Sequence, residues 1–173
     1  METLPEHRIA GRHQIDVAGM QTVMMKHHHI DTYALHCNFH LRGDESDRDE
    51  AFVREFCQAK QIPLQVAHFD TRHEAHLHHE SIEMAARRLR YTWFEAQQHH
   101  LAAQGICVAH HLDDQAETIL LNLIRGTGPQ GLQGIQPQRT IGSLNVVRPL
   151  LGYTKQELLD YLSSQSQSYV TDS

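Results

Sequence analysis

The sequence predicts an α/β protein: a doubly wound, mostly parallel sheet with helices on both faces. Short runs with strand-like composition occur at residues 8–10, 32–38, 64–69 and 106–110. Longer stretches with helical periodicity separate them. This alternation favours parallel pairing, because a parallel connection must cross back over the sheet through about a dozen residues or more.

Size and composition indicate one globular domain over residues 1–173. Apolar residues make up 40% of the chain and charged residues 21%, which is typical of soluble proteins. The absence of a long apolar run and of an apolar leader predicts a cytoplasmic protein without a membrane span. The net charge of −6 argues against broad nonspecific binding to nucleic acid, although it allows a local basic groove. Cys37, Cys57 and Cys107 lie far apart, which favours reduced thiols.

Five helices are expected, at residues 16–28, 46–60, 81–103, 113–125 and 154–162. Ser46 can cap the second helix, whose first turn is acidic. Thr154 and Glu157 have the spacing of a capping box at the start of the last helix. The final 20 or so residues are expected to begin a linker or helical region.

Polar clusters follow each strand-like run, at residues 11–16, 36–47, 69–71 and 110–117. Ligands of open α/β sheets bind beyond the carboxyl ends of the strands. We therefore expect the four clusters to share one rim of the sheet.

Several ionisable side chains of this rim are candidates for binding. Asp114 and Glu117 share a helix face and can hold Mg²⁺ or an ammonium group, or they can simply complement the positive helix end, with Asp113 as the cap. Arg90 can reach a phosphate, or it can belong to a solvated basic face. The anion candidates of the second cluster are His36, His40 and Arg42.

Sixteen histidines suggest a metal site, but their spacing does not support one. His73, Glu74 and His76 depart from the H-E-x-x-H pattern of zinc helices, in which the histidines are four residues apart. Solvated or partly buried histidines are the favoured interpretation.

Several ordered motifs resemble those of tRNA(Ile)-lysidine synthases, a family of the N-type ATP pyrophosphatase (PP-loop) superfamily. They are "HCNFHLRGDESDRDEAFVREFC", "IPL" with "FDT", "SIEMAARRLRYTWFE", "AHHLDDQAETILLNLIRGTGPQGLQGI", "VRPLL" and "YVTDS". The resemblance implies an adenine nucleotide alpha hydrolase-like fold. It also implies a cytoplasmic ligase that uses ATP and Mg²⁺ to adenylate the wobble cytidine of tRNA(Ile), after which free lysine displaces AMP.

The resemblance also assigns residues to roles. Asp16, Asp114 and Glu117 would be catalytic, with Asp16 near Mg²⁺ and with Asp114 and Glu117 beside the lysine or cytidine together with Arg42. ATP and its phosphates would contact the following residues: Gly11, Arg12, His13, Gln14, Asp16, His36 and Arg90.

The phosphate loop departs from the family's S-G-G-x-D-S, because the matching register reads R-H-Q-I-D-V from Arg12 to Val17. Glycines let loop amides approach phosphate, and a left-handed conformation costs a residue with Cβ roughly 1–2 kcal/mol. Two such positions correspond to about 30- to 1000-fold in affinity. A catalytically impaired remnant that acts as a binding domain is therefore the alternative.

Two further readings rank lower. A tRNA thiolase or an amide-forming synthetase of the same superfamily is one, although sulfur transfer generally needs paired cysteines. A histidine-rich metal module is the other. The sequence also stops before the C-terminal tRNA-binding region that the resemblance implies, so we expect that region to be absent from these 173 residues.

Overall fold

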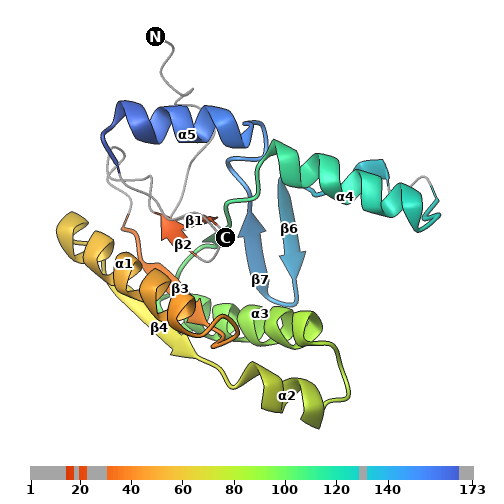
Figure 1. Cartoon of the computed structure of the whole chain (residues 1–173), viewed down its shortest axis with the longest axis horizontal. Coiled ribbons are helices and arrows are strands. Elements are labelled where there is room, and N and C mark those ends of the chain that lie inside the picture. The colour runs from red at the N-terminus through yellow and green to blue at the C-terminus, as the bar shows by residue number, and fades with distance from the viewer. Residues whose placement is uncertain (1–14, 18–19, 23–30, 129–131, 168–173) are drawn as a thin grey trace.

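A computed structural model of the chain describes residues 31–128 and 132–167, together with the backbone of residues 15–17 and 20–22 (Figure 1). The strands are β1 (Ile15–Val17), β2 (Met20–Thr22), β3 (Ala34–Asn38), β4 (Leu64–His68), β5 (Ile106–Cys107), β6 (Gln138–Ile141) and β7 (Leu144–Val147). The helices are α1 (Asp44–Lys60), α2 (Thr71–Leu77), α3 (Ile82–His100), α4 (Leu112–Ile124) and α5 (Lys155–Ser164).

Parallel pairing, the main prediction for the fold, is confirmed in two places. Strand β3 pairs with β4 over all five residues of each strand, and β5 pairs with β7. The pairs β6–β7 and β1–β2 are antiparallel. The described strands therefore form three small hydrogen-bonded sheets within an α/β fold.

Helices cover both faces of β3, as a doubly wound fold requires. Side chains of a strand alternate between its faces. Ala34 is buried with Val53 and Cys57 of α1, whereas its neighbour Leu35 is buried with Phe94 of α3. The α1 layer and the α3 layer therefore pack against alternate side chains of β3.

The segment that begins with β5 repeats this alternation. Ile106 and Val108 lie in the Phe94 core, together with Leu144 and Val146 of β7. Cys107 and Ala109 pack on the other side with Leu150, and partly buried Leu158 of α5 joins them. The α3 layer and the α5 layer therefore enclose this strand.

Four of the five predicted helices are confirmed, with boundaries shifted by up to three residues. The helix predicted at residues 16–28 is wrong where the structure describes the chain, because Asp16 and Val17 belong to β1 and residues 20–22 form β2. Strand β2 contacts β3 and β1 contacts β5, so tertiary pairing overrides the local periodicity. The remaining residues of that prediction, and the strand predicted at 8–10, lie outside the described residues. Helix α2 and the β6–β7 hairpin were not predicted.

The two predicted caps have different outcomes. Ser46 lies inside α1, and Gly43 is the N-cap residue, with φ of 55°. The Ser46 hydroxyl instead accepts a hydrogen bond from the backbone N–H of Arg42 at 3.2 Å. The capping box of α5 is confirmed, since Thr154 and Glu157 accept hydrogen bonds from each other's backbone N–H groups.

Helix α4 extends away from the sheets, at the right of Figure 1. None of its residues is buried. Its exposed apolar side chains are Leu112, Leu120, Leu121, Leu123 and Ile124. Within the described part of the chain, no helix is long and apolar enough to cross a membrane.

Candidate functional site

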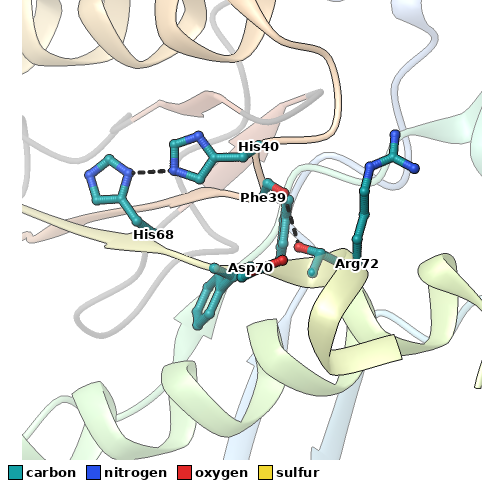
Figure 2. A pocket seen from close by; sticks show the side chains of 7 residues that line it. Phe39, His40, His68, Asp70 and Arg72 are labelled. Atoms are coloured by element: carbon teal, nitrogen blue, oxygen red, sulfur yellow. Dashed lines mark hydrogen bonds between the residues drawn. The ribbon is translucent and has the colours of Figure 1, made fainter. Parts of the chain in front are cut away.

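A pocket of about 330 Å³ opens at the carboxyl ends of β3 and β4 (Figure 2). Its residues are the last residue of β4 and members of the two segments that follow these strands: Phe39, His40, His68, Phe69, Asp70, Thr71 and Arg72. The rings of Phe39 and Phe69 are stacked, with centroids 5.5 Å apart. Thr71 Oγ1 donates to the carbonyl of Phe39 at 3.0 Å and ties the two segments together. The pocket therefore offers aromatic surface to a flat ligand, with charged groups at its edge.

Two histidines of the pocket form a coupled pair. His40 Nε2 and His68 Nδ1 lie 3.0 Å apart, and their rings are stacked (Figure 2). Each outer nitrogen faces a carboxylate: Asp47 at 3.9 Å from His40, and Glu50 at 3.6 Å from His68. One of the two facing nitrogens donates and the other accepts, so the tautomers of the two rings must be complementary.

Asn38 holds this side of the pocket in place. It is buried at the end of β3, and its amide donates to Glu50 at 2.9 Å and to Asp47 at 3.2 Å. Its carbonyl oxygen accepts from the backbone N–H of His40 at 3.0 Å. Burial acts to raise the pKa of Glu50, but hydrogen bonds from Asn38 and Arg54, with the charge of His68, lower it on balance.

A second group of side chains, the basic cluster, lies beside the pocket and consists of Arg87, Arg90, His110 and Arg148. Electrostatic interactions join His110 to the three arginines. The guanidinium of Arg90 also lies over the ring of Phe39, 5.2 Å from its centroid. Arg90 thus connects the end of β3 with the segment after β5, and the expectation of a common rim holds for these two segments.

The basic cluster is buried at one end. Arg148 is 6% exposed, and its Nη1 donates to the carbonyl of Gln136 at 2.9 Å. Burial, followed by the charge of Arg148, lowers the pKa of His110, although Asp114 acts in the opposite direction. Burial also lowers the pKa of Arg148, with Arg87 and Arg139 adding repulsion. His110 is therefore neutral at neutral pH, whereas the arginines stay charged.

The carboxylates at the start of α4 have three different environments. His111 caps the helix in place of Asp113, and Asp114 accepts from the backbone N–H of His111 at 2.8 Å. Asp113 instead accepts from the backbone N–H of Lys155 at 2.6 Å, which joins α4 to α5. Glu117 is exposed. The structure therefore engages Asp114 in a cap and leaves the Glu117 side chain in solvent.

Two residues predicted to line the nucleotide or substrate are held by other elements. His36 is 3% exposed, inside β3, on the same side of the strand as Ala34. Arg42 pairs with Asp49 of α1 at 2.8 Å while keeping 40% of its side chain exposed. Their proposed roles stay predictions.

The predicted phosphate loop falls largely outside the described residues, which exclude Gly11, Arg12, His13 and Gln14. The backbone of Asp16 lies in β1, whose neighbour β5 leads to the basic cluster. The side chain of Asp16 is outside the description. Its role toward ATP and Mg²⁺ stays a prediction.

No metal cluster supports the histidine hypothesis in residues 31–128 and 132–167, which contain no group of three or more His, Cys, Asp or Glu side chains able to hold an ion. The histidines at positions 27–29 lie outside these ranges.

The sequence analysis did not identify the aromatic walls, and of the basic cluster it gave a binding role to Arg90 alone. Phe39 and Phe69 belong to two of the family-like motifs, but the motifs do not indicate a role for either ring. Arg148 belongs to the motif "VRPLL". A usable signal was their position directly after hydrophobic strands, where a side chain reaches the rim. The burial of Arg148 has no sequence signal, because it depends on the hairpin and α3.

Comparisons with known proteins identify the family of the chain. A model of the family described as "PP-loop domain" matches residues 17–173, so Asp16 lies immediately before the match. The tRNA(Ile)-lysidine synthases of Parabacteroides distasonis and Bacteroides thetaiotaomicron are 51% and 52% identical over 140 residues, which is 81% of this chain and 31% and 32% of those proteins. The Bacillus subtilis protein of the same name is 38% identical over 139 residues, covering 80% of this chain and 29% of that protein. The chain spans about a third of the length of these relatives.

A solved structure shows the same fold. The U34-tRNA thiolase NcsA from Methanococcus maripaludis, solved with its [4Fe-4S] cluster, superposes with a TM-score of 0.64 over 82% of this chain and 49% of that chain, at 18% identity. This likeness concerns the fold alone. From the family match over residues 17–173, the chain belongs to the PP-loop domain family.

Proposed function

We propose that this chain is the nucleotide-binding part of a tRNA(Ile)-lysidine synthase-like ligase. ATP would adenylate the C2 carbonyl oxygen of the wobble cytidine of tRNA(Ile) with release of pyrophosphate, and the amine of free lysine would then displace AMP. The observation that carries the proposal is the identity of about one half to tRNA(Ile)-lysidine synthases over four-fifths of the chain.

The geometry supports nucleotide binding at the rim. The stacked Phe39 and Phe69 offer a surface for a flat base, and the basic cluster adjoins it through Arg90. Positive groups fixed beside a transferring phosphoryl group stabilise the charge that develops on it. The rim therefore provides aromatic and cationic groups at neighbouring positions.

The lysine amine would be held by Glu117, whose exposed carboxylate is in reach of solvent, with Asp114 beside it one helical turn away. Mg²⁺ would accompany ATP and offset the charge of the leaving pyrophosphate, with Asp16 as its proposed ligand. Magnesium in nucleotide sites needs only one or two carboxylates, since phosphates and waters supply the other ligands.

Calorimetry with Mg²⁺-ATP tests the nucleotide part of the proposal. We expect saturable binding to the wild-type chain, and weaker binding after Arg90→Gln. Absence of heat at millimolar nucleotide would contradict catalysis by this chain.

The altered phosphate loop separates the ligase from the remnant alternative. In the combined variant Arg12→Ser, His13→Gly, Gln14→Gly, a remnant would gain nucleotide affinity by about 30-fold or more. An active domain would bind ATP equally well before and after the change. Incorporation of radioactive lysine into a tRNA(Ile) transcript, with a uridine wobble base as the control, tests the complete reaction.

A further inference from the structure

The arginines of the described chain differ in whether a carboxylate lies beside them. Arg42, Arg48, Arg54 and Arg88 each lie within 3.2 Å of a carboxylate oxygen. In contrast, Arg87, Arg90 and Arg148 form no ion pair with a carboxylate in the part of the chain that the structure describes. Among the described residues, Arg72, Arg125 and Arg139 form no such ion pair either, but Arg87, Arg90 and Arg148 act together on His110, so their positive charge gathers at one place.

Three side chains of the basic cluster also present buried nitrogens without a hydrogen-bond partner. They are Nε of Arg90, Nδ1 of His110 and Nε of Arg148. A buried unsatisfied polar group costs about 1–3 kcal/mol, more when it is charged, so such groups are rare unless a ligand uses them. Their occurrence in three mutually interacting residues indicates a site rather than a local packing fault.

Neutral contacts hold the arginines in position. The guanidinium of Arg87 lies over the ring of Tyr91 at 5.0 Å, and Tyr91 also shares a hydrogen bond with Arg148. Arg148 donates to Gln136, and Arg90 lies over Phe39. None of these contacts neutralises the positive charge of the arginines. Their guanidinium groups are therefore held in place and remain available to an anion.

The site opens to solvent through Arg87, which is exposed, while Arg148 forms its buried end. Asp114 is the one carboxylate among the charges that act on His110, and the N-cap of α4 already engages it. Arginine forks match phosphate oxygens in pairs of hydrogen bonds. Three arginines together offer enough donors to bind two linked phosphates.

We propose that Arg87, Arg90, His110 and Arg148 bind a small polyphosphate anion of the pyrophosphate class, independently of the loop at residues 11–16. This inference deepens the proposed function, because the anion would be the part of ATP that leaves. It adds His110 and Arg148 as anion-binding residues and makes the altered loop less decisive for affinity.

Calorimetry with inorganic pyrophosphate tests the site directly. We expect wild type to bind pyrophosphate more tightly than inorganic phosphate, and Arg87→Gln and Arg148→Gln each to weaken binding by roughly 10- to 100-fold, as expected for one charged hydrogen-bonding contact. Arg125→Gln, at the exposed end of α4, removes the same charge away from the site and should leave the affinity unchanged.

Arg148→Gln changes a buried residue and can affect folding, so Arg87→Gln carries the test if the melting curve of the Arg148 variant is altered. Equal pyrophosphate affinity in wild type and Arg87→Gln would overturn the proposal, as would no binding at millimolar pyrophosphate. If a tRNA transcript bound to wild type and more weakly to Arg87→Gln, while pyrophosphate did not bind, the pyrophosphate proposal would be wrong. The cluster would then be a site for the RNA backbone.

Proton NMR of His110 gives a second readout. The groups that face its ring are Arg148, Asp114, Arg87 and Arg90, and burial with the arginine charges lowers its pKa. A bound anion favours the protonated ring, so pyrophosphate should raise the pKa of His110 in wild type and in Arg125→Gln. An unchanged pKa at saturating pyrophosphate would contradict the proposed contact.

The outcomes separate this site from the proposed function. Pyrophosphate binding without Mg²⁺-ATP binding would support the anion site and contradict the ligase. ATP binding that Arg87→Gln leaves unchanged would support the ligase and contradict the anion site.

Discussion

Replacing Asn38 with aspartate tests how the histidine side of the pocket is held. The change exchanges one NH₂ group for an oxygen, so it removes the donors to Glu50 and Asp47 and adds a third carboxylate. The bond to Glu50 is buried and charge-assisted, worth about 1.5–3 kcal/mol. The bond to Asp47, whose side chain is 68% exposed, adds less than about 1 kcal/mol. With repulsion included, we expect a loss of about 3 kcal/mol.

Thermal unfolding followed by circular dichroism measures this loss. For a chain of this size, about 3 kcal/mol corresponds to a melting temperature lower by about 6–12 °C at pH 7. Crowded carboxylates have raised pKa values, so the defect should shrink at about pH 5, where the introduced carboxyl group would be partly protonated and able to donate. Asn145→Asp is the matched control, because the NH₂ group of Asn145 makes one long contact, 3.4 Å to the carbonyl of Gln104, while its Oδ1, which accepts from Gln138 at 3.0 Å, is kept by the substitution. Equal melting of the two variants would refute this account of Asn38.

Three further outcomes are expected. Phe94→Ala removes a side chain that is 0% exposed and should cost about 3–5 kcal/mol in urea unfolding, so a cost below about 1 kcal/mol would contradict the core described for α3. Burial raises the pKa of Cys57 to about 11, so iodoacetamide at about pH 8 should modify this thiol, as judged by mass spectrometry, only after denaturation; rapid labelling of the native protein would argue against its burial. His111→Ala removes the N-cap of α4 at a cost of about 0.5–2 kcal/mol, and hydrogen exchange should quicken in the first turn of α4 and not in α5; uniform exchange in both would exclude a capping role.

The class of fold and most elements could be predicted because local patterns encode them. The capping box at Thr154 and the apolar runs of β3 and β4 depend on residues close in sequence, and all three are found. The helix expected at residues 16–28 failed because β1 and β2 are short strands fixed by distant partners. Hairpin β6–β7 was missed for a similar reason: its outer strand is largely exposed and lacks an apolar face.

The candidate site was predictable in its location and less so in its members. Arg90 was predicted to contact phosphate; its guanidinium lies over Phe39 at the rim, and its role toward phosphate stays a prediction. The sequence does not show that Arg90 lacks a carboxylate partner among the described residues, because Arg88, two residues earlier in the same helix, pairs with Glu74 and Glu80. Similarly, the hydrogen bond from the backbone N–H of Lys155 to Asp113 joins residues that are far apart in the sequence, so the sequence does not predict it.

The alternating sides of β3 make this strand sensitive to insertions within it. Ala34 fits against α1 and Leu35 against α3, so inserting one residue would exchange the two environments. A leucine would then meet a space sized for alanine, and the Phe94 side would lose volume. Two added residues would restore the alternation. Natural insertions within β3 should therefore avoid odd numbers of residues.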